Sequence, residues 1–209
     1  MTANVPNILT LSRILVIPLI CGLLYVNGPL AAWLALAAYL YACITDFLDG
    51  YIARLTQQQS RFGSMLDPIA DKLLVASVLM VLVGIGRLSS TDVIAALIIL
   101  CREIVVSGLR EYLAELQVSV PVTKLAKWKT TLQMVALGVL IVAGGLPPLG
   151  PIDMAEVGVA GLWLAAGLTL ITGYDYLRAG LAHVRAAEGS PPAGVSERER
   201  RPMLPAGET

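Results

Sequence analysis

Two pairs of aspartates are the residues of this sequence best placed to do chemistry. Asp46 and Asp49 are three positions apart in the sequence, so they share one face of a helix. Asp67 and Asp71 are four apart and do the same, and the polar segment 57–61 would let the two helices fold back against each other. Four converging carboxylates are very costly at membrane depth without a partner, so a positive charge must lie between them. A bound metal ion fits that requirement.

The chemistry that such a cluster supports is displacement at phosphorus. Carboxylates with no His or Cys nearby suit a hard cation such as Mg²⁺ or Mn²⁺. Four acids from two helices can hold two such ions roughly 3.5–4 Å apart, the usual arrangement for in-line displacement. Gly50 and Ala53 lie one turn beyond the first pair, where their small size would let a phosphate approach the backbone. Arg54 brings a fixed positive charge for a phosphate oxygen, or else extends from an inner helix end toward water.

Composition indicates a membrane protein. Of 209 residues, 56% are hydrophobic and 14% charged, against about 25% charged in an ordinary soluble domain. The formal net charge is zero, and no basic face suggests nucleic acid as a partner. Cys21, Cys43 and Cys101 lie in apolar runs and His183 is the only histidine, so neither a disulfide framework nor a zinc site is expected.

The elements that must position the acids are six predicted transmembrane helices. Turn signals at Asn27-Gly28-Pro29, at 84–86 and at 144–148 divide the apolar runs. The predicted helices cover residues 8–26, 30–55, 63–84, 91–115, 122–145 and 153–185. Each is long enough for a bilayer core of about 30 Å. We therefore predict an all-α, six-helix bundle in one domain, 1–185, with a polar cavity facing the cytoplasm and a disordered tail, 186–209.

Basic residues set the expected orientation. The segments on one side hold Arg13, Arg54, Arg61, Arg110, Lys124, Lys127, Lys129 and the C-terminal arginines. The opposite loops, 27–29, 85–91 and 146–152, hold only Arg87. This asymmetry predicts a multi-pass protein of the cytoplasmic (inner) membrane with both termini and the acids on the cytoplasmic side. The lysines at 124–129 could serve as topology signals alone.

The acids also belong to a pattern that resembles a known family. Asp46-x2-Asp49-Gly50-x2-Ala53-Arg54-x8-Gly63-x3-Asp67-x3-Asp71 is similar to the signature of the CDP-alcohol phosphotransferases, with every signature position filled. The resemblance implies transfer of a phosphatidyl group from CDP-diacylglycerol to an alcohol, with release of CMP, by a homodimer. It implies two metal ions on the four aspartates, and Asp71 as the group that takes the hydroxyl proton. The residues it implies for the CDP-lipid are Asn7, Thr10, Arg13, Gly50, Ala53, Arg54, Ser60 and Gly63.

Further segments indicate the acceptor. VPNILTLSRILVIPLI, CREIVVSGLREYLAEL and KLAKWKTTLQMVAL resemble family members that use glycerol 3-phosphate. One position departs from them: Ala126 precedes the first lysine of KxK where glycine is usual, and its methyl would narrow the site. The basic residues expected to hold the acceptor phosphate are Arg102, Arg110, Lys127 and Lys129. Inositol phosphate, serine and phosphatidylglycerol remain alternative acceptors.

Two other interpretations concern the charged residues. Intramembrane acids also line cation pathways in transporters, but the predicted helix 63–84 runs VASVLMVLVGIG after Lys72 without a charge. No path across the membrane is therefore visible in that helix. Glu103 stands seven residues before Arg110, so the two could form a structural ion pair instead of contacting substrate.

Overall fold

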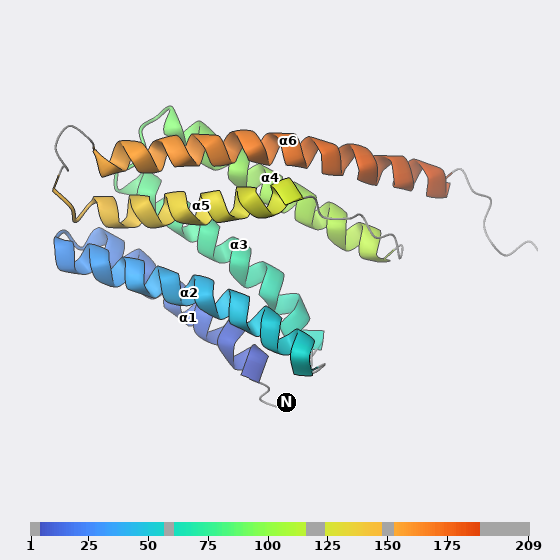
Figure 1. The fold of residues 1–209 in the computed structure, drawn as a ribbon, viewed down its shortest axis with the longest axis horizontal. Helices are drawn as coiled ribbons and strands as arrows, with labels where there is room; N and C mark the ends of the chain where they lie inside the picture. The colour runs from blue at the N-terminus through green and yellow to red at the C-terminus, as the bar shows by residue number, and fades with distance from the viewer. Residues whose placement is uncertain (1–4, 57–60, 116–123, 148–152, 189–209) are drawn as a thin grey trace, which may run out of the picture.

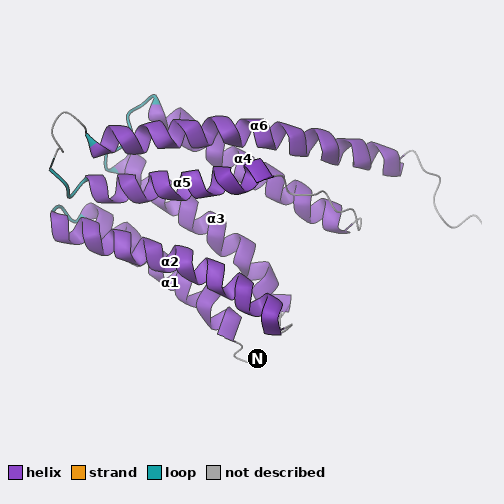
Figure 2. Ribbon diagram, in the orientation of Figure 1, coloured by secondary structure: helices purple, strands orange, loops and turns teal. Residues whose placement is uncertain are grey.

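The computed structural model describes residues 5–56, 61–115, 124–147 and 153–188, and these form six α-helices with no strand (Figures 1 and 2). The helices are α1 (Val5–Tyr25), α2 (Pro29–Thr56), α3 (Arg61–Gly84), α4 (Asp92–Glu115), α5 (Lys124–Ala143) and α6 (Met154–Glu188). The predicted all-α class and the six helices are confirmed, with every boundary within three residues of its expected place. The predicted tail lies outside the described residues from position 189 onward, and residues 186–188 continue α6.

Two antiparallel helix pairs form the frame of the bundle. Figure 1 shows α1 beside α2 and α5 beside α6, with α3 running obliquely between the pairs and α4 against α6. The beginning of α1, the end of α2 and the beginning of α3 meet at one end of the bundle, which we call the aspartate end because it holds Asp46, Asp49 and Asp67. The last turns of α1, α3 and α5 and the first turns of α2, α4 and α6 lie at the opposite end.

The surface of the bundle suits lipid. Within the described residues, three helices are long and apolar enough by length and composition to cross a membrane, at Ile8–Tyr25, Pro29–Asp49 and Met154–Ala182. Large apolar side chains such as Leu15 and Met80 are mostly exposed, while leucines and isoleucines of α1, α3 and α5 fill the interior. Exposed apolar residues on this scale are expected where the solvent is hydrocarbon. The protein is a membrane protein.

Glycine lets α5 and α6 approach closely. A Cβ at Gly158 would lie 2.7 Å from Leu140 Cγ, and one at Gly161 would lie 3.1 Å from the Cβ of Ala136. Small residues at such positions are the usual means by which helices associate in lipid, where no hydrophobic force drives them together. The close contact fixes the rotation of α5 and hence the direction in which its polar residues face.

The beginning of α4 is fixed by hydrogen bonds between Ser89 and Asp92. The backbone N–H and the hydroxyl of Ser89 donate to Asp92 Oδ2, at 3.1 and 2.5 Å, while the carbonyl of Ser89 accepts from the first turn. The indole N–H of Trp163 on α6 donates to the other carboxylate oxygen at 2.9 Å. The Ser89 and Trp163 bonds hold the pKa of the Asp92 carboxyl below its usual range. Together these contacts tie the beginning of α4 to α6.

Arg87, the one basic residue of the opposite loops, forms hydrogen bonds within the fold. Its Nη1 donates to the carbonyls of Leu140 and Ile141, at 3.1 and 2.8 Å, in the last turn of α5. Those carbonyls have no partner within the helix, and a cation there also complements the helix dipole. A Cβ at Gly144 would overlap the guanidinium. The exception to the basic-residue asymmetry is therefore explained by a helix cap.

We expect Arg87→Ala to lower the stability of the bundle by about 1–3 kcal/mol, because it leaves two half-buried carbonyls without a donor. Gly144→Ala should act in the same direction, since its methyl displaces the guanidinium. Thermal unfolding of the purified protein in one detergent measures both, with Arg178→Ala on the exposed face of α6 as the matched arginine control. Equal unfolding midpoints for Arg87→Ala and the control would show that the cap does not stabilise the fold.

Candidate active site

One arginine lies at the centre of the aspartate end. Arg13 Nη1 donates to Asp46 Oδ1 at 2.5 Å, and Nη2 donates to Asp49 Oδ2 at 2.5 Å. Nη1 also lies 3.4 Å from Asp67 Oδ1, so a single guanidinium contacts carboxylates from both α2 and α3. The positive charge that the sequence required among the acids is present, and in this structure a residue of α1 supplies it.

Helix geometry places these groups. Thr10 and Arg13 are three residues apart on α1, and both are buried on the face toward Asp49, with Thr10 Oγ1 donating to Asp49 Oδ2 at 3.4 Å. Ser12, on a neighbouring face of α1, lies 3.1 Å from the hydroxyl of Tyr41 on α2. Asp46 and Asp49 share one face of α2, as their spacing predicted. α1 and α2 are thus held in register by polar contacts on two faces of α1.

The acids are graded in exposure. The side chain of Arg13 is completely buried and that of Asp49 is 3% exposed, whereas Asp46 and Asp67 are 38% and 43% exposed. One positive charge therefore faces three carboxylates, two of which open toward water. The cluster retains negative charge on its open side, where a cation or a cationic complex can approach.

The residues present fit a divalent metal. One carboxylate oxygen each from Asp46, Asp49 and Asp67 lies within 4.8 Å of the others. Bonds from Mg²⁺ or a larger hard cation to oxygen are roughly 2.0–2.6 Å, so oxygens on opposite sides of one ion stand roughly 4–5 Å apart. The structure thus brings together three of the four predicted ligands. Asp71 lies one turn further along α3 and faces a separate cavity.

That cavity lies between α3, α4 and α5. Its volume is about 290 Å³, and its wall is apolar apart from five residues: Asp71, Lys72, Glu103, Thr130 and Gln133. Lys72 Nζ donates to Ser107 Oγ on α4 and lies 3.9 Å from Glu111 Oε1. The cavity brings the predicted base, Asp71, together with polar residues of α4 and α5.

A second charged cluster adjoins the cavity and includes two residues predicted to hold the acceptor phosphate. Lys129, which is 3% exposed, donates to Glu103 Oε1. Arg102 Nη1 lies 3.4 Å from the same oxygen, and its Nη2 donates to Thr172 Oγ1 on α6 at 3.3 Å. Arg102 and Lys129 are thus brought together, and each has a carboxylate partner.

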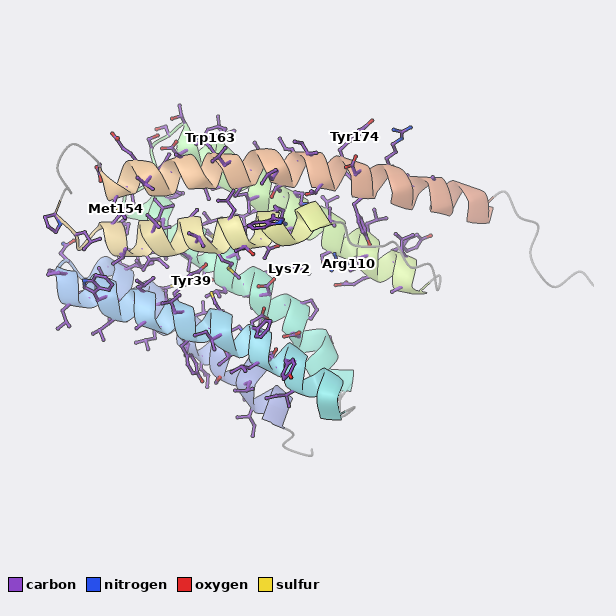
Figure 3. The ribbon with its side chains drawn as sticks, in the orientation of Figure 1. Tyr39, Lys72, Arg110, Met154, Trp163 and Tyr174 are labelled. Atoms are coloured by element: carbon purple, nitrogen blue, oxygen red, sulfur yellow. The ribbon has the colours of Figure 1, made fainter. Side chains whose placement is uncertain are left out.

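Arg110 lies on the part of α4 that leads toward the aspartate end (Figure 3). Its guanidinium carbon stands 5.8 Å from the centre of the Tyr176 ring on α6, a cation–π contact. The hypothesis of a Glu103–Arg110 ion pair is therefore wrong, because Glu103 pairs with Lys129 and Arg102.

The remaining predicted site residues are placed only by their backbone or lie outside the description. Asn7 is in the first turns of α1, Gly50, Ala53 and Arg54 are in the last turns of α2, and Lys127 is in the first turn of α5. Gly63 is in the first turn of α3. Ser60 lies outside the described residues. All the helix ends named here except that of α5 converge at the aspartate end.

The sequence analysis missed Gln133. It follows Lys129 by four residues, so the two share one face of α5, and a glutamine in the apolar run of that helix was the available signal. Both side chains are 3% exposed. Polar residues buried in a membrane helix mark functional or packing positions.

These features define a class: a helical membrane protein whose carboxylates can hold a metal at one end of the bundle. A family model for CDP-alcohol phosphatidyltransferases matches residues 3–171. The chain belongs to the CDP-alcohol phosphatidyltransferase family. It is a transferase, and members of this family are generally metal-dependent, in keeping with the aspartate cluster.

Curated relatives cover most of the chain. A protein of Rickettsia typhi named CDP-diacylglycerol--glycerol-3-phosphate 3-phosphatidyltransferase is 52% identical over 84% of this chain and 96% of its own. A protein of the same name from Cereibacter sphaeroides is 39% identical over 88% of this chain and 99% of its own. A cardiolipin synthase (CMP-forming) of Oryza sativa subsp. japonica is 36% identical over 84% of this chain and 56% of its own.

We expect Arg13→Ala to destabilise the protein by about 3 kcal/mol, because it leaves the buried carboxylate of Asp49 without its counter-charge. Adding Mg²⁺ should recover part of that loss, since a bound cation would replace the missing charge. Unfolding in detergent, with and without Mg²⁺, measures both effects. Asp175→Asn, on the exposed face of α6, is the control for a charge change elsewhere. A variant as stable as the wild type would show that Arg13 is not the counter-charge of the cluster.

Proposed function

We propose that this protein transfers the phosphatidyl group of CDP-diacylglycerol to sn-glycerol 3-phosphate and releases CMP. The chief support is the group of three carboxylates within 4.8 Å of one another at the aspartate end. The names of the Rickettsia typhi and Cereibacter sphaeroides relatives support this pair of substrates. A carboxylate site suits the reaction because charge must be neutralised as a diphosphate is cleaved.

In the proposed reaction a hydroxyl oxygen of glycerol 3-phosphate forms a bond to the phosphorus that carries diacylglycerol. The bond from that phosphorus to the bridging oxygen of CMP breaks, and CMP leaves with the bonding electrons. Asp71 accepts the hydroxyl proton, a role for which its place on the wall of the α3–α4–α5 cavity is suited. Two divalent ions, Mg²⁺ or Mn²⁺, held by Asp46, Asp49, Asp67 and Asp71, would supply neutralisation of the diphosphate charge.

The protein's own residues position the two substrates. The proposed CDP-lipid site comprises Asn7, Thr10, Arg13, Gly50, Ala53, Arg54, Ser60 and Gly63. Thr10 and Arg13 contribute by fixing the carboxylates, because both bond to Asp49. The proposed acceptor-phosphate group comprises Arg102, Arg110, Lys127 and Lys129. Since Arg102 and Lys129 already bond to Glu103, we expect Arg110 and Lys127 to provide most of the charge for the phosphate.

The proposal includes a location and an assembly. The asymmetry of the basic residues supports a location of both termini and the site on the cytoplasmic side of the inner membrane, and the cap formed by Arg87 accounts for the one basic residue opposite. Residues 1–185 would form the catalytic membrane domain, followed by a cytoplasmic tail. The family resemblance supports a homodimer.

A second candidate acceptor is phosphatidylglycerol, which the name of the Oryza sativa relative brings into consideration. The two acceptors differ physically. Glycerol 3-phosphate is soluble and carries a dianionic phosphate, whereas phosphatidylglycerol enters from the bilayer. Arg110 near the end of α4 and Lys127 near the beginning of α5, which are not paired with Glu103 in this proposal, favour the soluble, more highly charged acceptor.

The purified protein in detergent should release CMP from CDP-diacylglycerol only when glycerol 3-phosphate and Mg²⁺ or Mn²⁺ are present. Excess chelator should abolish release reversibly, and Asp67→Asn should lower it by about 100-fold or more, because a metal ligand is lost. Asp175→Asn is the matched control, an identical change on the exposed face of α6. Full activity in chelator would refute the metal site. Release with phosphatidylglycerol and none with glycerol 3-phosphate would establish the second candidate.

Asp71→Asn should keep the affinity for CDP-diacylglycerol while kcat falls by about 100-fold or more, the usual contribution of a positioned base. Asp71 faces the cavity one turn beyond the three clustered acids, and the amide of asparagine still offers one oxygen to the metal, so binding of the lipid nucleotide should persist. Lipid-nucleotide affinity and kcat are measured on one preparation. Loss of both together would make Asp71 a metal ligand only, and retention of kcat would place the base elsewhere.

A further inference from the structure

Gln133 has a buried side-chain oxygen for which the described residues provide no hydrogen-bond donor. Its side chain is 3% exposed, and its Oε1 is buried without a hydrogen-bond partner among the described residues. The residue lines the cavity between α3, α4 and α5, on whose wall Asp71 also stands. A buried amide oxygen without a partner costs free energy, so such an atom beside a cavity indicates a ligand that completes it.

The cavity has the size of a site for a small molecule. Its volume of about 290 Å³ is just below the roughly 300–1,000 Å³ usual for small-molecule sites. Its wall is mostly apolar with a few polar groups, the arrangement in which isolated hydrogen bonds decide specificity. A ligand that enters it meets Asp71 on α3 and Gln133 on α5.

The two lysines that adjoin this cavity already have partners. Lys129, one turn earlier on α5, donates to Glu103, and Lys72 donates to Ser107. A phosphate would find no uncommitted cation among these groups, so this part of the cavity favours an uncharged portion of the ligand. The phosphate of the acceptor belongs nearer to Arg110 and Lys127, toward the end of the bundle where α4 ends and α5 begins.

The chemistry of the atom narrows the choice further. An amide oxygen only accepts hydrogen bonds, so its partner must bring a donor. The ester and acyl groups of diacylglycerol have no donor, which excludes the lipid tail of the first substrate as that partner. A hydroxyl of the acceptor alcohol is a donor without charge.

We propose that Gln133 Oε1 accepts a hydrogen bond from the middle hydroxyl of glycerol 3-phosphate, the one that does not react. This inference rests on the function proposed above and makes Gln133 a specificity-determining residue. Asp71 and Gln133 then bind neighbouring hydroxyls from two walls of one cavity, which orients the reacting hydroxyl toward the phosphorus.

The test compares glycerol 3-phosphate with 3-hydroxypropyl phosphate, the same molecule without its middle hydroxyl. The wild type should prefer glycerol 3-phosphate in kcat/KM by about 10- to 100-fold, because the analogue leaves Oε1 unpaired. Gln133→Leu should lose most of that preference: its kcat/KM for glycerol 3-phosphate falls, while that for the analogue stays near the wild-type value. Gln133→Met, which keeps the unbranched shape, should behave in the same way and serves if the leucine variant does not fold.

The control is Thr169→Val on α6, which also removes a buried hydroxyl that has no partner among the described residues. It should leave the preference between the two acceptors unchanged. A wild type that turns over both acceptors equally, or a variant that loses activity on both equally, would overturn the inference and leave the proposed function standing. A wild type that releases CMP with neither acceptor would overturn the proposed function and the inference with it.

Discussion

The structure depends on the contact between one guanidinium and three carboxylates. Acids at the edge of a bilayer repel one another and lose hydration, so they can converge only if a counter-charge is built into the fold. Arg13 provides it, and in doing so it joins α1 to α2 and α3, the three helices that form the aspartate end. The same contact leaves Asp46 and Asp67 partly open, so the cluster that is stable in the fold can still take a cation.

The second charged cluster follows the same rule with the signs reversed. Arg102 and Lys129 would repel each other in the interior, and Glu103 lies between them. Each helix that contributes a charge to the protein's polar region therefore receives an opposite charge from another helix. The packing of the helices and the placement of the charged groups therefore depend on each other in this fold. Rotation of one helix would break its apolar contacts and its ion pairs together.

The sequence predicted the helices and the shared face of Asp46 and Asp49 well because both depend on short spacings, whereas Asp71 lies outside the cluster that Asp67 forms with them. The turn at Gly28 and the separations of Asp46 from Asp49 and of Asp67 from Asp71 are local signals. The partners of the charges were less predictable, because Arg13 meets residues 33 to 54 positions away and Lys129 meets Glu103 at a separation of 26. Spacing along α4 suggested Arg110 as the partner of Glu103, but seven residues span about 10 Å of helix, and Glu103 bonds to Lys129 of α5 while Arg110 lies against Tyr176 of α6. Gln133 was missed because its importance lies in a cavity formed by three helices.

The position of Arg13 in the chain has a consequence for biosynthesis. Chains are made from the N-terminus, and Arg13 precedes all three of its carboxylate partners. When α2 and later α3 enter the membrane, Arg13 on α1 is already present to neutralise their carboxylates. Burial of the Asp49 carboxylate is a costly step of insertion, and the first helix lowers that cost because it already carries the counter-charge. The aspartate end can assemble before α4, α5 and α6 have been synthesised.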